Sequence, residues 1–335
     1  MKDFVITVDC GTTNTRAVLW DSQRAIVDAE KNPVGVRSTA IDGHNRKLKA
    51  GVKNCIDTLL VRNKIDFEEV KCIIASGMIT SNIGLVEIPH LVVPVSADDL
   101  AEAVKPVLIE DVCPLPIWFI TGVKNADGEV TLANYEAMDI MRGEEVESCA
   151  IIDKLHDGKP MLLVLPGSHT KFVSVDAERR MVGCLTSITG ELLASITNDT
   201  ILAGAVEHSF VEEDTYDREL LLQGYDTAKK TGLGRACFSG RILSLFGNKD
   251  KHAIANFLLG ATLQTDVIAI KNSDAIHADH NTTVVVAGNN PLCRAIADIL
   301  RHEGGFAEIV EYQQNGDASL SSLGAYIVAG KTNIL

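Results

Sequence analysis

A β-type run that ends in an acidic residue and a glycine turn is the most restrictive feature of this sequence. The run Phe4 to Asp9 is followed by Gly11-Thr12-Thr13-Asn14 and then by a second short β-type run, Ala17 to Trp20. Two such runs joined by a polar turn predict an antiparallel strand pair. Glycine lets a ligand approach the backbone closely, and backbone N–H groups and threonine hydroxyls donate to anionic oxygens. The turn is therefore a candidate phosphate site, in which Asp9 could hold a hydrated divalent cation.

A second glycine turn, in the other half of the chain, strengthens this interpretation. The first turn alone favours a hairpin without a ligand, because Gly, Thr and Asn are ordinary turn residues. The second turn, Gly167-Ser168-His169-Thr170-Lys171, lies between the predicted strands Met161 to Leu165 and Phe172 to Asp176. We predict that it binds phosphate and that Lys171 faces the charge of a transferring phosphoryl group. A serine hydrolase is disfavoured, since no G-x-S-x-G motif occurs.

A third candidate turn follows the strongly β-type run Thr283 to Ala287. It consists of Gly288, Asn289 and Asn290, and Pro291 then opens a predicted helix. The base or ribose of a nucleotide could lie over this turn, because its glycine adds little bulk. Junctions of this kind are common in α/β proteins, so the turn taken alone favours no ligand.

Two further segments carry polar side chains that packing does not require. The segment 76–87 supplies Ser81, Asn82 and Glu87, and the segment 138–147 supplies Arg142, Glu144 and Glu145. An acidic first turn stabilises a helix through its dipole, which accounts for the two later glutamates. It does not account for Arg142, because a cation is disfavoured at a helix start. An arginine there is suited to a two-point grip on a carboxylate.

The order of the predicted elements indicates an α/β protein with two similar lobes. A chain of 335 residues exceeds one average core of roughly 150 residues. After the first two strands we expect a strand at 25–30, a helix over 44–62 and a strand at 70–75, and the second half has a comparable order with a helix at 190–205. We place the lobes at 1–150 and 151–335. The helical stretch 207–272 carries no recognisable motif.

The composition limits the classes of partner that we expect for this protein. The net charge of −14 argues against nucleic acid or an anionic membrane as the main partner. The eight cysteines are widely spaced, which predicts reduced packing residues rather than a zinc site. No signal-peptide pattern follows Met1 and no stretch approaches 18 apolar residues, so we expect a cytoplasmic protein. The P-loop, H-E-x-x-H and G-x-G-x-x-G motifs are all absent.

Together and in this order, DCGTTNTR, LPGSHTKF and VVVAGNNP resemble the phosphate-one, phosphate-two and adenosine motifs of the sugar kinase, Hsp70 and actin superfamily. Within it, SGMITSNIG, MRGEE, PGSHTK and TGEL are similar to the 2-dehydro-3-deoxygalactonokinase family, over about 4–195 and 284–330. The resemblance implies an actin-like ATPase fold, with two duplicated ribonuclease H-like lobes of β-β-β-α-β-α-β-α type. ATP and Mg²⁺ would lie in the cleft between the two glycine turns, and the sugar acid would lie against the first lobe.

The resemblance also implies an activity and roles for residues. The activity is ATP-dependent phosphorylation of the 6-hydroxyl of 2-dehydro-3-deoxy-D-galactonate, a step of galactonate catabolism. Related kinases place an acidic general base where MRGEE stands, so Glu144 is the first choice, with Glu145 and Asp139 as alternates. The expected substrate contacts are Arg142 for the carboxylate, Ser81 and Asn82 for hydroxyls, and additionally Glu87 and Arg16.

Two alternatives remain open at this point. One is another small sugar or amino-sugar kinase of the same superfamily. The other is a nucleotide-switched ATPase like actin or Hsp70, which would hydrolyse ATP slowly regardless of sugar. The sequence does not decide whether the protein forms a homodimer.

Overall fold

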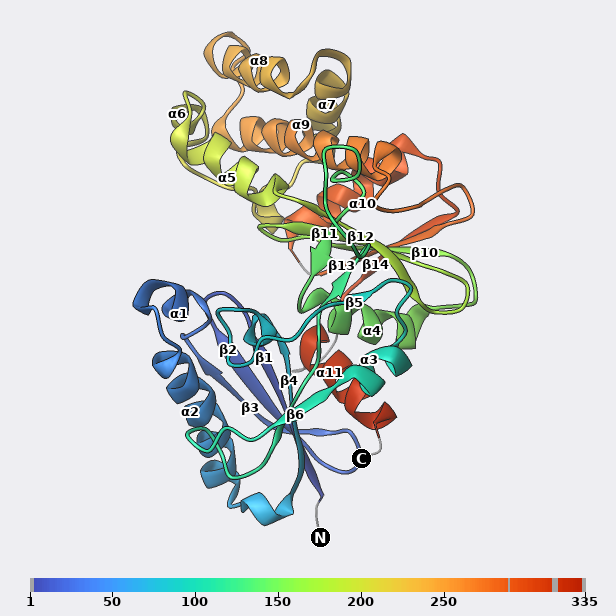
Figure 1. The fold of residues 1–335 in the computed structure, drawn as a ribbon. Helices are drawn as coiled ribbons and strands as arrows, with labels where there is room; N and C mark the ends of the chain where they lie inside the picture. The colour runs from blue at the N-terminus through green and yellow to red at the C-terminus, as the bar shows by residue number, and fades with distance from the viewer. Residues whose placement is uncertain (1–2, 289, 315–318, 333–335) are drawn as a thin grey trace.

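Two β-sheets built on the same plan form the centres of two lobes (Figure 1). The computed structural model describes residues 3–288, 290–314 and 319–332. The first lobe contains β1 (Phe4–Cys10), β2 (Thr15–Trp20), β3 (Ile26–Asn32), α1 (Arg37–Asp42), α2 (Arg46–Asn63), β4 (Val70–Gly77), α3 (Ala97–Ala103), β6 (Lys105–Val107) and β7 (Ile117–Phe119). The second contains β10 (Met161–Leu165), β11 (Thr170–Val175), β12 (Met181–Ser187), α5 (Thr189–Asp199), α6 (Ala203–Val206), α7 (Arg218–Thr231), α8 (Leu233–Phe246), α9 (Lys251–Asn272), β13 (Thr283–Ala287), α10 (Pro291–Glu303) and β14 (Glu308–Tyr312).

The two sheets share both strand order and strand direction. The first runs β3-β2-β1-β4-β7 with β6 at its edge, and the second runs β12-β11-β10-β13-β14. In each sheet the three strands that come first in the chain pair antiparallel, and two later strands, β4 and β7 or β13 and β14, add parallel to the innermost of them. The edge strand β6 of the first sheet pairs antiparallel with β7 and has no counterpart in the second. The predicted duplication and the predicted actin-like ATPase fold are therefore confirmed.

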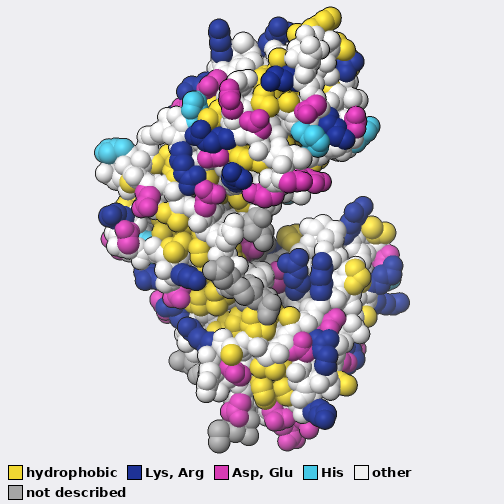
Figure 2. All heavy atoms as spheres, turned by 180° about the vertical axis from the view of Figure 1, so that it is seen from behind, with side chains coloured by type: hydrophobic (Ala, Val, Ile, Leu, Met, Phe, Trp, Pro, Cys, Tyr) yellow, Lys and Arg dark blue, Asp and Glu magenta, His cyan; other side chains and the backbone are white. Residues whose placement is uncertain are grey.

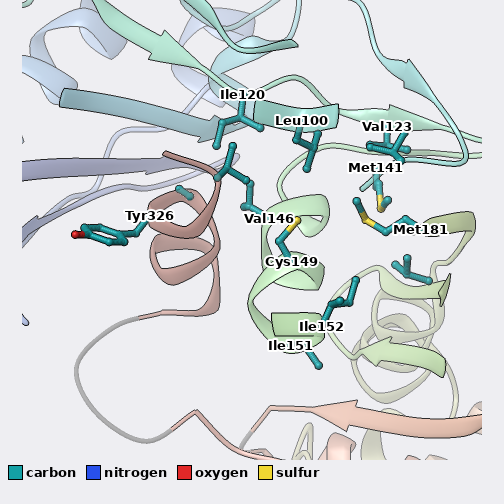
Figure 3. Packing of buried hydrophobic residues seen from close by; sticks show 14 of the residues in the cluster. Leu100, Ile120, Val123, Met141, Val146, Cys149, Ile151, Ile152, Met181 and Tyr326 are labelled. Atoms are coloured by element: carbon teal, nitrogen blue, oxygen red, sulfur yellow. The ribbon is translucent and has the colours of Figure 1, made fainter. Parts of the chain in front are cut away.

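Helices from both halves of the sequence join the lobes. α4 (Glu144–Leu155) begins beside the small sheet formed by β5 (Leu91–Val92), β8 (Val123–Lys124) and β9 (Ile140–Met141). α11 (Leu320–Lys331) follows the second lobe in sequence but packs on α4, α3, β1 and β4, as Figure 1 shows in red. Figure 3 shows Val146, Cys149 and Ile152 along α4, in the apolar cluster that also contains Tyr326 of α11 and Met181 of β12. The predicted boundary at residue 150 falls within α4 and remains a prediction.

The helical stretch without a predicted role supplies much of the core of the second lobe. α9 is apolar, with a mean hydropathy of 1.5 over its most apolar window, and most of it is buried beneath α7 and α8. It is the one helix among the described residues that could cross a membrane by length and composition. Its burial identifies it as a core helix. The eight cysteines are all free and buried, in agreement with their predicted packing role.

The structure corrects two predicted boundaries. β11 begins at Thr170, so the second turn is shorter than the predicted 167–171, because Thr170 and Lys171 pair with Ser187 and Thr186 of β12. The predicted helix 190–205 is two helices, α5 and α6, which are separated at Thr200. The helix predicted over 44–62 is α2, which presents a buried apolar face to the first sheet.

Candidate active site

The first glycine turn is a fixed hairpin at the end of β1. The Gly11 N–H donates to the carbonyl of Asn14 at 2.9 Å, and the side chains of Thr12 and Thr13 are exposed. The segment that leads into α1 holds the turn from behind, where a Cβ added to Gly35 would lie 2.4 Å from the Gly11 carbonyl oxygen. The side chains of Thr12 and Thr13 are therefore available to an anion without a rearrangement of the turn.

The second glycine turn is held in the same manner in the other lobe. The Glu191 N–H donates to the carbonyl of Ser168 at 3.1 Å, and a Cβ added to Gly190 would lie 2.2 Å from the Gly167 carbonyl oxygen. Ser168 and His169 are exposed, and His169 Nε2 lies 3.0 Å from Glu191 Oε1. Each turn is thus braced by a glycine at the start of the next helix, α1 or α5. Figure 2 shows the surface hollowed between the two lobes, and in Figure 1 these helices border that region.

Two residues of the predicted second phosphate motif are not part of the exposed turn. Thr170 is buried in β11, and its hydroxyl has no hydrogen-bond partner among the described residues. Lys171 is also buried, and its ammonium group donates to the Ile140 carbonyl at 2.7 Å and to the Thr186 hydroxyl. The sequence pattern predicts both residues in a polar turn, because it does not show that β11 begins two residues earlier, at Thr170. Lys171 instead ties β11 to β9.

The third turn is shaped by helix capping. Asn290 is the N-cap of α10, and its side chain accepts the Cys293 N–H at 3.0 Å. Gly288 has φ of +142°, and a Cβ there would lie 2.4 Å from Cys293 Sγ, so the position requires glycine. Asn289 lies outside the described residues.

Asp9 is the penultimate residue of β1, opposite Arg16 of β2 and Ser76 of β4 in the strand registers. Its Oδ2 accepts a hydrogen bond from the Ser321 hydroxyl at 3.0 Å. Burial raises the pKa of Asp9, an effect that Ser321 and Arg16 oppose and that Glu144 adds to. The described residues include no cluster of three side chains suited to a metal ion. Mg²⁺ in nucleotide sites often binds one or two carboxylates together with phosphates and water, so Asp9 fits that cation.

A cavity of about 350 Å³ brings together most of the predicted substrate residues. It lies where the segment after β4 meets β9, the start of α4 and β11. Its lining includes Ser81, Asn82, Glu87, Arg142, Glu144 and Lys171, all predicted, and also Met78, His90, Ile140 and Met141. Sequence analysis predicted Ser81 and Arg142 for one ligand, although they lie 61 positions apart. Arg16 is not among the residues that line this cavity.

Arg142 is anchored by backbone carbonyls at this cavity. Its Nη1 donates to the Thr80 carbonyl at 2.8 Å, and its Nη2 donates to the Ile88 carbonyl at 3.0 Å. His90 lies 3.1 Å from Nη2, and burial, together with the charges of Arg142 and Lys124, lowers the pKa of His90 to about 4. His90 is therefore neutral near pH 7. No motif in the sequence marks His90, because its role depends on the fold of the 78–90 segment.

Three glutamates of α4 differ in environment. Glu144 lines the cavity, and its Oε2 accepts the Arg142 N–H at 3.1 Å. Glu145 is buried, and its Oε2 accepts the Gly143 N–H at 2.6 Å. Burial, and next the charge of Glu144, raises the pKa of Glu145 to about 8. Of the three, Glu144 is the one that reaches the cavity.

Glu147 was not predicted as a site residue. It is half-buried, and its pKa is raised to about 8 by burial, then by the charges of Asp9 and Glu144. It therefore lies close enough to both carboxylates to interact with them. Its position three residues after Glu144 on the same helical face is a signal that the sequence does contain.

The remaining candidate base, Asp139, is engaged in structural contacts. Its Oδ2 accepts the Thr186 N–H at 2.5 Å and its Oδ1 accepts the Thr186 hydroxyl at 2.7 Å. Lys171 Nζ lies 3.8 Å from Oδ1. These contacts join β9 to β12, and Asp139 does not line the cavity.

Two duplicated lobes, each with a braced glycine turn, and a cavity lined by Arg142 and Glu144 fit a carbohydrate kinase of the actin-like ATPase fold. The chain matches the 2-keto-3-deoxy-galactonokinase family over residues 9–323, and it belongs to that family.

Individual relatives agree with this assignment. The chain is 25% identical over 281 residues to the 2-dehydro-3-deoxygalactonokinase of Escherichia coli (strain K12), an alignment that covers 84% of each protein. A Rhizobium meliloti (strain 1021) protein with the same assigned activity is 38% identical over 78 residues, which cover 23% of this chain and 24% of the relative. A crystal structure of a Sinorhizobium meliloti protein assigned the same name superimposes with a TM-score of 0.73 at 18% identity, over 98% of this chain and 97% of the other. This last similarity supports the fold.

Proposed function

We propose that this kinase transfers the γ-phosphoryl group of ATP to the 6-hydroxyl of 2-dehydro-3-deoxy-D-galactonate, with Mg²⁺ as the cation. The family assignment carries the reaction class. The observation that supports a sugar acid as the acceptor is the 350 Å³ cavity, whose lining combines a guanidinium, a carboxylate and hydroxyl or amide groups.

Glu144 is the proposed general base. Glu144 lines the cavity and acts electrostatically on Asp9, which lies near the end of the strand that leads into the first glycine turn. A base in that place can accept the proton of the attacking hydroxyl, a contribution of about 10²- to 10⁴-fold in rate. Glu145 and Asp139 are the weaker alternatives, because neither lines the cavity.

Arg142 is the proposed partner of the substrate carboxylate. Its two terminal nitrogens already bind carbonyls, while its Nε–H has no hydrogen bond to any described residue. We infer that the guanidinium attracts the carboxylate by its charge and one free donor. This differs from the two-point grip expected from the sequence. Ser81 and Asn82 would contact the hydroxyls, and Glu87 stands at the same wall.

The nucleotide would lie between the two braced turns, with Gly11 to Asn14 on one side and Gly167 to His169 on the other. The backbone N–H groups that are not paired within the turns would donate to phosphate oxygens, whereas the Gly11 N–H is held by the Asn14 carbonyl. Mg²⁺ bound to those phosphates would neutralise part of the charge of the transferring group. Lys171 adds positive charge from the wall of the cavity, and closure of the lobes would exclude water.

The test is ADP release by the purified protein with a panel of acceptors. We expect activity with 2-keto-3-deoxy sugar acids, with the galactonate stereoisomer preferred, and little with neutral hexoses or amino sugars. Equal activity on neutral sugars would favour another sugar kinase. Slow ATP hydrolysis that no sugar changes would favour a nucleotide-switched ATPase.

A further inference from the structure

Ser321 belongs to the last helix of the chain, yet its hydroxyl contacts the end of the first strand. It is 3% exposed, and its Oγ donates to Asp9 Oδ2 at 3.0 Å, across 312 positions of sequence. No other hydrogen bond to the Asp9 carboxylate occurs among the described residues. A hydrogen bond to a charged carboxylate is stronger than one between neutral groups, and it fixes the orientation of the carboxylate.

The same helix also fixes α4. Gly324 of α11 lies against the Val146 carbonyl of α4, where a Cβ would stand 1.7 Å from the oxygen. α4 carries Glu144 at its first position. α11 is in turn the element that follows β14 of the second sheet. One helix therefore contacts both Asp9 and the helix of the proposed base, and it connects them to the lobe that carries the third turn.

A purely structural role for the Ser321 hydroxyl is the alternative. Its Oγ also lies 3.0 Å from Ser319 Oγ, and Ser319 caps α11 by accepting the Ser322 N–H at 3.2 Å. The buried hydroxyl of Ser321 would thus have a partner without Asp9. Asp9, by contrast, would lose its one hydrogen-bond donor. The hydrogen bond therefore matters more for the orientation of the Asp9 carboxylate than for the stability of α11.

We propose that Ser321 is a positioning residue for Asp9. Its hydrogen bond occupies Oδ2 and leaves Oδ1, which lies beside Gly77, as the oxygen that can bind the cation of a metal–ATP complex. This inference rests on the proposed function, because it assigns Asp9 to that cation. It predicts that removal of the Ser321 hydroxyl weakens the metal-dependent part of ATP binding and leaves sugar-acid binding unchanged.

The test compares Ser321→Ala with Ser322→Ala. Ser322 is 1% exposed and lies in the same helical turn, but its hydroxyl contacts Ser319 and not Asp9. Calorimetry gives the Kd of ATP with and without Mg²⁺ for each variant of the full chain. We expect Ser321→Ala to lower the ratio of the two affinities by about 10- to 150-fold, the range of one hydrogen bond to a charged group. Ser322→Ala should retain the wild-type ratio, and Ser321→Thr, which restores the hydroxyl, should recover it.

Kinetics supply the second readout. Ser321→Ala should require more Mg²⁺ for half-maximal rate, with the KM for the sugar acid within about 2-fold of wild type. Ser321→Cys keeps the volume of the side chain but is a weak donor, so it should show the same loss even if the alanine variant unfolds. An unchanged affinity ratio in folded Ser321→Ala or Ser321→Cys overturns the inference. The affinity ratio is measured without a sugar acid. A failure of this inference can therefore be distinguished from a failure of the proposed function, which the acceptor assay tests.

Discussion

Gly324 of α11 and Val146 of α4 are in direct backbone contact. A Cβ on Gly324 would lie 1.7 Å from the Val146 carbonyl oxygen and 2.5 Å from its carbon. Those atoms are backbone, so they cannot move aside as a flexible side chain would. The contact sets how closely the two helices that join the lobes approach each other.

Gly324→Ala should therefore destabilise the protein by about 1–3 kcal/mol or more, because overpacking forces the helices apart. Gly330→Ala is the matched control, since Gly330 lies on the same helix, is exposed, and a Cβ there would come no closer than 3.9 Å to another residue. It should be neutral or stabilise by about 0.5–1 kcal/mol. Urea unfolding of both variants measures the difference, and equal stability would contradict the close contact.

Gly190→Ala should weaken ATP binding, because its Cβ would displace the backbone of the second glycine turn. We expect the KM for ATP to rise about 10-fold or more, with a smaller change for the sugar acid. Gly204→Ala, a helical position in the same lobe with no atom within 4 Å of its Cβ, is the control. If both variants behave like wild type, the second turn does not bind the nucleotide.

Glu144→Gln should lower kcat by about 10²- to 10⁴-fold, because the amide cannot accept the hydroxyl proton. The Kd for ATP, measured by calorimetry, should stay within about 2-fold of wild type. Glu145→Gln should lower kcat far less, since Glu145 does not line the cavity, and this comparison separates the two candidate bases. Unchanged turnover in Glu144→Gln would remove it as the base and favour Glu145 or Asp139.

Arg142→Ala should raise the KM for the sugar acid by about 10- to 100-fold and the KM for ATP far less, because it removes a charged donor. Arg142→Lys keeps the charge but not the planar geometry, so its KM should be intermediate. The KM for ATP is the internal control. Equal increases for the two substrates would exclude a specific role in binding the carboxylate.

Glu145 should make stability depend on pH. Burial raises its pKa from 4.5 to about 8 in the folded protein. Between these values the unfolded chain loses the proton while the folded protein keeps it, so the free energy of unfolding falls as the pH rises. Glu145→Gln removes this effect. Its stability relative to wild type should therefore increase from pH 5 to pH 8 in urea unfolding, and a difference that does not vary with pH would contradict the assignment.

Local sequence patterns were sufficient for most of the strands and turns. The runs at Met161 to Leu165 and Thr283 to Ala287 match β10 and β13 residue for residue, and Asn290 with Pro291 marks the start of α10. These features depend on side-chain type and spacing within a few residues. The same patterns, with their order along the chain, led to the duplicated fold and the family.

Local sequence patterns could not predict the contacts between distant segments. Lys171 belongs to a strand because both Thr170 and Lys171 pair with β12. Its ammonium group therefore donates to the Ile140 carbonyl and is not exposed in a turn. His90 became a candidate only when its surroundings were known, whereas Glu147 follows Glu144 at a helical spacing that the sequence already contains.

By itself, the sequence determined most of the segments that form strands, which turns are candidates for phosphate and which polar residues packing leaves unexplained, since each of these depends on short-range chemistry. Tertiary structure alone decided which oxygen of Asp9 is hydrogen-bonded, which donors of Arg142 remain free and which glutamate reaches the cavity. Those properties depend on contacts between segments up to 312 positions apart in the sequence. No pattern within a few residues shows which distant segments come together.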